Sequence, residues 1–150
     1  MAKIDRINAQ ILRILGDDAR IANTALAEKV GLSPSACLRR VQELERSGAI
    51  QGYRAVVAPE ARDVGFVAYI TVGLSDHTKA AQEAFERALE RFDEVLECHN
   101  VTGSVEYILR VETADLGAFK VLHTDKLGEL PSVRQMTSHV VMYSPKDMRA

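Results

Sequence analysis

The first third of the chain carries apolar residues at helical spacing in two short segments. Asp5 is a residue type that caps helices, and Gly16 follows the apolar run, so a helix is predicted between them. In the second segment, Asn23 is the expected cap and Gly31 the expected left-handed end. The positions predicted to be buried are Ile7, Ile11, Ile14, Leu15, Leu26, Ala27 and Val30.

A third helix is predicted directly after this glycine turn. Ser33 at the cap and Pro34 at the first helical position mark its start, and Gly48 ends it after Ser47. One side of this helix carries Cys37, Val41 and Leu44, with Leu38 at the edge. The opposite side carries Ser35, Ala36, Arg39, Gln42 and Glu43, with Arg40 on the flank. An extended segment from Ile50 to Val57 is interpreted as a wing that folds back.

The pattern changes after residue 58. The string "PEARDVG", residues 59–65, is interpreted as a linker. Runs of β-branched and aromatic residues then predict strands at 66–74, 95–101, 105–112 and 133–143. Helical spacing predicts helices at 78–92 and 115–127. The buried positions expected in the second of these helices are Leu116, Phe119, Leu122 and Leu127.

The order of these elements, βαββαβ, is that of a ferredoxin-like domain with both helices on one face of an antiparallel sheet. The sequence therefore predicts an α+β protein with a winged helix-turn-helix domain in residues 1–58 and a ferredoxin-like domain in residues 66–150. The other face of the sheet is expected to be open and partly apolar, which favours a homodimer that packs sheet on sheet.

The outer face of the 34–47 helix is suited to double-stranded DNA. Small residues such as Ser35 and Ala36 let a helix backbone enter the major groove, and arginines then reach base edges or phosphates. Residues 1–60 hold nine Lys/Arg and seven Asp/Glu, a balance of +2, although the whole chain has a net charge of −2. This basic bias supports a nucleic-acid partner. The alternative is that Arg39 and Arg40 only form a solvated helix face.

The composition of the chain indicates the cellular compartment in which the protein is expected. Two cysteines, Cys37 and Cys98, are too few for a disulfide framework, which favours a reducing compartment, and Cys37 is expected in the core. The polar start "MAKIDRINAQ" does not resemble a signal peptide, and no apolar run approaches the roughly 20 residues that span a bilayer. A cytoplasmic protein with no membrane partner is expected.

Neither catalysis nor metal binding is expected. His77, His99, His123 and His139 show no metal-ligand spacing, and Cys98 and His99 point to opposite faces of a strand. The sequence contains no nucleophile–base pair, glycine-rich phosphate loop or pair of catalytic carboxylates. The chain is therefore not expected to be an enzyme, and no cofactor is predicted.

The turn at Gly103 is a candidate ligand site. Gly103 is expected to supply a positive φ between two strands, and backbone N–H groups at such a turn suit the carboxylate of an amino acid. Glu106 would then meet the ammonium group. The alternative is that Glu106 pairs with a basic residue of a neighbouring subunit. Asn100 and Thr102 lie near the same strand end.

Several strings resemble the Lrp/AsnC transcription regulators, the leucine-responsive and asparagine-responsive proteins. They are "IDRINAQIL", "DDARIANTALAEKVGLSPSACLRRVQELERSGAIQGYRA", "ECHNVTGSVEYIL" and "VVM", and they cover Ile4 to about Met142. The resemblance implies that the 34–47 helix is the recognition helix and that the ferredoxin-like domain senses a ligand and forms oligomers. It also implies sheet-mediated dimers that assemble into octamers, with small amino acids bound between dimers.

The resemblance also implies the site residues. The DNA contacts it implies are Ser33, Ser35, Arg39 and Arg40, and the groove argument adds Ala36 to them. The effector contacts it implies in the turn are Gly103, Ser104 and Glu106, and Asn100 and Thr102 are added because they lie near the same strand end. The family usually carries a Gly-Asp-Tyr-Asp-like turn, whereas here Ser104, Val105 and Glu106 follow the glycine. Because Glu is one methylene longer than Asp, Glu106 would reach further into a pocket.

These observations predict a sequence-specific transcriptional regulator whose DNA binding or assembly responds to an amino acid or related metabolite. Two alternatives remain at this point. One is an architectural protein that wraps DNA and ignores metabolites. The other is a metabolite-binding module that regulates an enzyme by protein contact.

Overall fold

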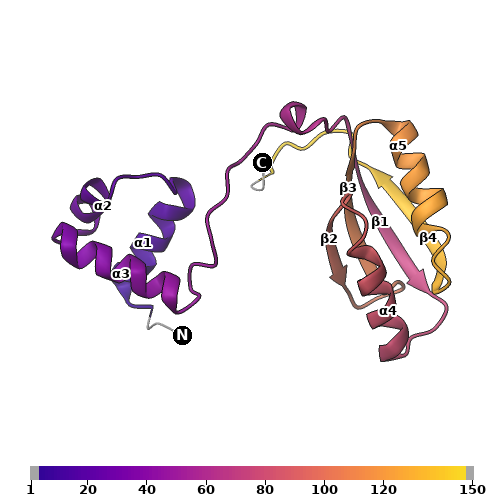
Figure 1. The fold of residues 1–150 in the computed structure, drawn as a ribbon, viewed down its shortest axis with the longest axis horizontal. Helices are drawn as coiled ribbons and strands as arrows, with labels where there is room; N and C mark the ends of the chain where they lie inside the picture. The colour runs from indigo at the N-terminus through magenta and orange to yellow at the C-terminus, as the bar shows by residue number, and fades with distance from the viewer. Residues whose placement is uncertain (1–3, 148–150) are drawn as a thin grey trace. The chain divides into compact units, whose positions relative to one another are not determined.

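The chain divides into two units in the computed structural model, which describes residues 4–147 without the side chain of Glu60. One unit ends at Ala55 and the other begins at Val56. The first contains the helices α1 (Arg6–Asp17), α2 (Asn23–Val30) and α3 (Pro34–Arg46) (Figure 1). Its core consists of Ile11, Leu26, Ala27, Val30, Cys37 and Leu44. The apolar sides predicted for the three helices, including a buried Cys37, are confirmed.

Local signals account for most of the helix ends. The Asp5 carboxylate accepts a hydrogen bond from the Asn8 N–H at 2.7 Å and caps α1. Ser33 Oγ accepts from the Ala36 N–H at 3.3 Å, and Pro34 occupies the first position of α3. Gly31 ends α2 with a φ of 69°, the left-handed conformation that glycine adopts without strain.

The structure differs from the expectation at two places in this unit. Asn23 does not cap α2 but lies inside it, because its side-chain amide donates to the Pro34 carbonyl at 2.9 Å and so ties α2 to α3. The segment expected to fold back as a wing is extended and exposed over residues 51–57, with no strand partner among the described residues. The Tyr53 hydroxyl anchors it by donating to Glu45 at 2.9 Å.

The second unit is a four-stranded sheet covered by helices. The strands are β1 (Phe66–Leu74), β2 (Val95–Asn100), β3 (Tyr107–Thr113) and β4 (Val133–Val140), in the order β2-β3-β1-β4. All neighbouring strands are antiparallel. The helix α4 (Lys79–Leu89) and the helix α5 (Leu116–Lys120), which continues into the π-helix η2 (Val121–Leu127), lie on one face of this sheet (Figure 1). The ferredoxin-like βαββαβ topology is confirmed.

The core of this unit lies between the helices and alternate strand positions, as the period of a strand requires. The helix-facing strand residues are Ala68, Ile70, Val72, Leu74, Tyr107, Leu109 and Val111, and they pack against Phe85, Leu89, Phe119, Leu122 and Leu127. The prediction that Leu116 is buried is wrong, because this residue is 64% exposed. It borders an apolar cavity with Phe119 and His123 instead of entering the core.

The open face of the sheet is more polar than expected. Strand register places Tyr69 and Thr71 of β1 on this face, beside Arg110 and Ile108 of β3 and His139 and Thr137 of β4. Glu112, with a side chain only 4% exposed, accepts from Arg110 and Arg62, each at 2.6 Å. Arg62 belongs to η1 (Pro59–Arg62), a short 3-10 helix inside the segment expected to be a linker.

Candidate functional site

The exposed surface of α3 carries most of the residues predicted to contact DNA. Ser33 and Ser35 are exposed at its start, with hydroxyl oxygens 3.3 Å apart, and Ala36 is half-buried beside them. Arg39 is exposed, and its guanidinium forms no hydrogen bond or ion pair with any other side chain among residues 4–147. This surface therefore presents small residues and one uncommitted cation, a combination that suits a major groove.

Arg40 lies differently from its neighbour. Its Nη1 donates to Asp5 Oδ2 at 2.7 Å and to Asn8 Oδ1 at 3.0 Å, and its side chain is 33% exposed. The Asn8 N–H and the Arg40 guanidinium hold the pKa of the Asp5 carboxyl below its ordinary value of 3.8. Arg40 therefore ties the start of α1 to α3, and the structure does not aim both arginines outward as the sequence analysis expected.

Leu38 was predicted to lie at the edge of the buried side of α3. It is 46% exposed on the same helix as Ser35 and Arg39. An apolar side chain on a recognition helix can contact the methyl group of thymine. The helical wheel contained this signal, because Leu38 falls between the buried side and the outer side.

The turn between β2 and β3 brings part of the predicted effector site together. The Val101 N–H donates to the Glu106 carbonyl at 2.8 Å, which closes the turn and makes β3 begin at Tyr107, two residues later than predicted. Thr102, Gly103 and Ser104 are exposed in this turn, and Gly103 has the predicted positive φ, 140°.

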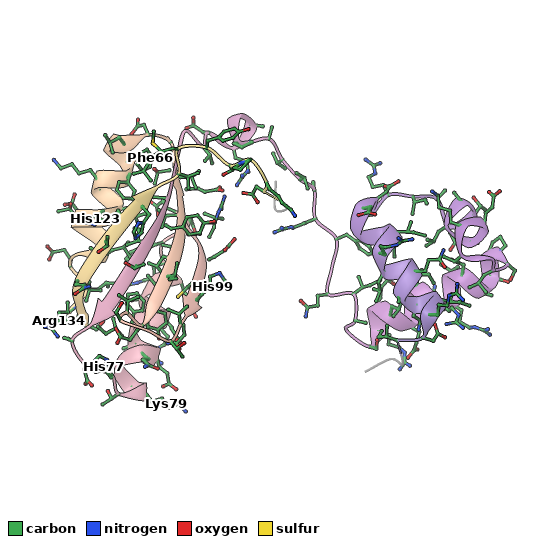
Figure 2. All side chains as sticks on the ribbon, turned by 180° about the vertical axis from the view of Figure 1, so that it is seen from behind. Phe66, His77, Lys79, His99, His123 and Arg134 are labelled. Carbon is green, nitrogen blue, oxygen red and sulfur yellow. The ribbon has the colours of Figure 1, made fainter. Side chains whose placement is uncertain are left out.

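Glu106 points back over the end of β1. Its Oε2 accepts from the Leu74 N–H at 2.7 Å, and its Oε1 lies 2.9 Å from Nδ1 of His77. The Glu106 side chain is 19% exposed and that of His77 is 72% exposed. Figure 2 shows His77 at the end of the sheet where β1 leads into α4. His77 was not predicted as a partner of Glu106, because no local sequence pattern links it to the β2–β3 turn.

Asn100 does not join Glu106. Strand register pairs Asn100 with Tyr107, a helix-facing residue, and the nearby Asn100 side chain acts to lower the pKa of the Tyr107 hydroxyl. Tyr107 also donates to Glu86 of α4 at 2.7 Å, and burial together with this carboxylate raises the pKa of Tyr107 to about 12. Asn100 therefore belongs to a cluster on the helix-covered face.

One further reactive group, the Cys98 thiol, is kept protonated by its surroundings. Partial desolvation of the sulfur and the nearby Glu86 raise the pKa of the Cys98 thiol to about 11, so it is protonated near neutral pH and is a weak nucleophile. No group of three or more His, Cys, Asp or Glu side chains within residues 4–147 could hold a metal ion. In the same part of the chain, no helix is long and apolar enough to cross a membrane.

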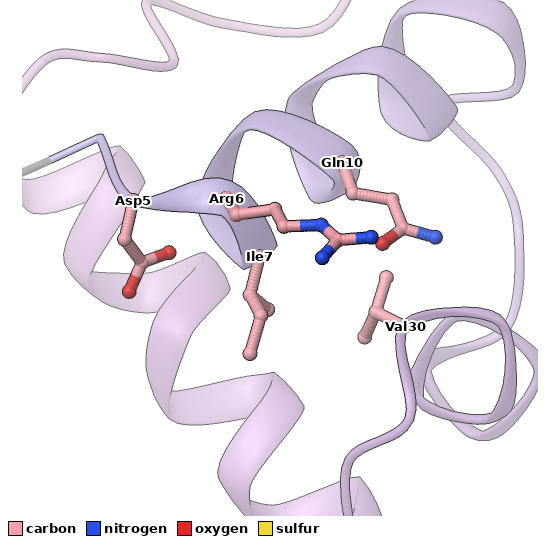
Figure 3. A pocket seen from close by; sticks show the side chains of 5 residues that line it. All are labelled: Asp5, Arg6, Ile7, Gln10 and Val30. Carbon is pink, nitrogen blue, oxygen red and sulfur yellow. The ribbon is translucent and has the colours of Figure 1, made fainter.

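Two cavities lie away from the β2–β3 turn. One, of about 510 Å³, lies between the start of α1 and the end of α2 and is lined by Asp5, Arg6, Ile7, Gln10 and Val30 (Figure 3). The other, of about 650 Å³, lies beside α5 and is lined mainly by Leu116, Phe119 and His123, with Lys120 and Ser138. Neither includes a residue predicted to bind the effector.

Comparison with known proteins identifies both units. Residues 4–51 match the model of a winged helix-turn-helix DNA-binding domain, and residues 67–150 match that of the Lrp/AsnC ligand binding domain. The leucine-responsive regulatory proteins of Escherichia coli K12 and Salmonella typhimurium are each 38% identical over 143 residues, which cover 95% of this chain and 87% of theirs.

Solved structures agree. A transcriptional regulator from Neisseria meningitidis in complex with L-Met superposes with a TM-score of 0.91 at 34% identity, covering 97% of this chain and 94% of that one. A feast or famine regulatory protein from M. tuberculosis, complexed with L-methionine, gives 0.85 at 30% identity, covering 97% and 96%. E. coli AsnC gives 0.87 at 25% identity, covering 97% of both chains. The chain belongs to the Lrp/AsnC family of transcriptional regulators.

Proposed function

We propose that this protein regulates transcription by binding double-stranded DNA through α3, and that an amino acid modulates this binding. The observation that carries the DNA part is the outer surface of α3, where Arg39 is exposed and uncommitted next to Ser33 and Ser35. Arg39 and the two serines contact the groove or the backbone, Leu38 supplies an apolar contact, and Arg40 holds the helix in place through Asp5.

The amino-acid part is supported by the β2–β3 turn and by the relatives. Two similar regulators have been solved with methionine. Here the exposed turn at Thr102, Gly103 and Ser104 offers backbone N–H groups for a carboxylate, and Glu106 offers a carboxylate for an ammonium group. A coupling free energy of about 1–3 kcal/mol between the two sites would change DNA affinity by roughly 5–150-fold.

Assembly completes the proposal. Two chains pack their open sheet faces together, and the resulting dimer presents two α3 helices to half-sites that lie about one helical turn of DNA apart, or a multiple of it. Dimers then assemble to octamers, with the effector between them. The open face supports this because Tyr69, Thr71 and Ile108 leave apolar and small polar surface beside the Arg110–Glu112 pair.

The DNA test uses the segment upstream of the protein's own gene and an unrelated segment of equal length. Arg39→Ala is expected to weaken binding to the first by about 1–3 kcal/mol if Arg39 contacts a base. Equal weakening on both segments would assign Arg39 to a phosphate. Arg46→Ala is the matched control, because Arg46 is a 77% exposed arginine at the other end of α3, paired with Glu43.

The effector test follows on the same DNA. Each common L-amino acid is screened by thermal shift, and those that stabilise the protein are added to the binding assay. A change in DNA affinity supports the proposal. Binding to every DNA segment alike, with no response to any amino acid, would instead establish an architectural protein.

A further inference from the structure

Glu106 is already engaged by two groups of its own chain. Its Oε2 is fixed by the Leu74 N–H at 2.7 Å, a backbone donor at the end of β1. Its Oε1 is 2.9 Å from Nδ1 of His77, in the loop between β1 and α4. An ammonium group that approaches this carboxylate therefore meets His77 at the oxygen that faces the loop.

The two contacts differ in how easily they are lost. The Leu74 N–H belongs to a buried strand residue and cannot move without disturbing the sheet. The His77 side chain is 72% exposed, so it can turn into water at small cost. Departure of His77 would leave the carboxylate oriented by Leu74 and open at Oε1.

We infer that His77 competes with the effector's ammonium group for Oε1 of Glu106, so that amino-acid binding displaces His77. A histidine N–H and an ammonium group are both hydrogen-bond donors to a carboxylate, which makes one a chemical substitute for the other. This inference rests on the proposed function, because it concerns the same effector site.

Displacement of His77 can be transmitted to α4 through the residues next to it in the chain. The next residue, Thr78, caps α4 by accepting from the Ala81 N–H at 3.3 Å, and Asp76 accepts from the Thr78 N–H at 2.9 Å. Effector binding would therefore act on the loop from Ser75 to Thr78 and on the start of α4.

The other charged groups at this end of the sheet do not take the place of His77. Lys79 is directed to Glu83, 3.6 Å away, and the Asp76 carboxylate is held by Thr78. Arg134, on β4 beside the end of β1, lies at the same end of the sheet as His77 (Figure 2). Of these basic residues, His77 is the one in contact with Glu106.

The test compares variants of the full-length protein by calorimetric titration with the amino acid that gives the largest thermal shift, L-methionine being included in the screen. His77→Ala removes the competitor, so the dissociation constant is expected to fall by up to about fivefold, the range of an exposed ion pair. His77→Lys supplies a permanent ammonium group and is expected to raise the dissociation constant. Lys79→Ala removes a neighbouring cation that does not touch Glu106 and is expected to change nothing.

Opposite signs for the two His77 variants separate competition from a general effect on the loop. If both variants weaken binding, His77 contacts the effector directly, and the inference is wrong. If the wild type binds an amino acid and His77→Ala binds it equally well, the ammonium group uses another lone pair of Glu106, and the inference again fails while the proposed function stands. If no amino acid binds the wild type, both fail. Far-UV circular dichroism verifies that each variant is folded.

Discussion

At the scale of single residues, Arg39 and Arg40 show how adjacent arginines acquire different roles. Successive helical residues are about 100° apart, so one guanidinium lies on the outer surface of α3 while the other reaches back to α1. Asp5 holds Arg40 and caps α1 at the same time, which makes this carboxylate a support for α3. The orientation of α3 therefore depends on a residue that lies outside α3.

The lowered pKa of Asp5 predicts a pH dependence for the helical head. The ionised form is favoured in the folded state, so the stabilisation is complete above the ordinary value of 3.8 and is lost as the pH falls through the lower folded value. Asp5→Asn is therefore expected to melt earlier than the wild type at pH 6, and the difference is expected to shrink at pH values below 3.8. Thermal denaturation followed by circular dichroism checks this, with Asp17→Asn, near the other end of α1, as the control.

Sequence reasoning found the residues whose roles are set by neighbours in the chain. Ser33, Pro34 and Gly31 act on the helices they bound, and their roles were predicted correctly. Asp5–Arg40 and Glu106–His77 join residues far apart in the chain, and no local pattern announces such pairs. Asn23 failed as a cap for a similar reason, because its side chain is oriented by the Pro34 carbonyl, 11 residues away in the chain.

At the scale of elements, α3 depends on a cap that is also a candidate DNA contact. Ser33→Asp separates the two roles, because aspartate caps a helix as well as serine does and suits the positive end of its dipole, whereas its charge repels phosphate. We expect the melting temperature to be retained and DNA affinity to fall.

Ser33→Ala is the matched variant for the cap. It removes the acceptor for the Ala36 N–H and is expected to cost about 0.5–2 kcal/mol of stability. Thermal melting and a DNA-binding titration on both variants measure the two effects. Undiminished DNA binding by Ser33→Asp would place the phosphates away from the start of α3.

The segment that joins the two units, residues 51–62, is expected to be most mobile before Pro59. Residues 51–57 are exposed, whereas η1 is held by the Arg62–Glu112 pair and by the Gly65 N–H, which donates to the Thr113 carbonyl at 3.1 Å. Limited trypsin digestion should therefore cut after Arg54 well before it cuts after Arg62, as mass spectrometry of the fragments would show. Glu112→Gln should make Arg62 more susceptible; equal rates at both arginines in the wild type would contradict this view.

The bounds of elements with an uninterrupted hydrophobic pattern were predicted closely. Local irregularities within or next to the elements were not predicted. The bounds of β1 match the prediction, because its β-branched and aromatic run is uninterrupted. The change from α-helix to π-helix at Val121 adds one residue per turn, and no residue type signals it. The later start of β3 follows from a backbone hydrogen bond between Val101 and Glu106, which side-chain patterns do not report.

At the scale of the whole molecule, the two units differ in net charge and in the surfaces that they expose. The DNA-binding head carries the basic balance of the chain, and the sensing domain carries the acidic one. The sheet has one face filled by helices and one face open, so dimerisation through the open face would pair two heads without involving α3.

The proposed dimer can be tested at the middle of the open face. Thr71 of β1 lies in register between Ile108 and Thr137. In a two-fold interface every substitution occurs twice, so Thr71→Arg would bring two new cations together near Arg110, and like charges across an interface cost several kcal/mol. We expect light scattering to report single chains and DNA binding to lose its preference for paired half-sites, while a single half-site is bound as before.

Glu90→Arg is the control and should leave the dimer intact, because Glu90 is exposed at the end of α4 on the helix-covered side. A Thr71→Arg protein that remains dimeric would show that the chains meet through another surface, and the spacing of the two α3 helices would then have to be derived from that surface instead.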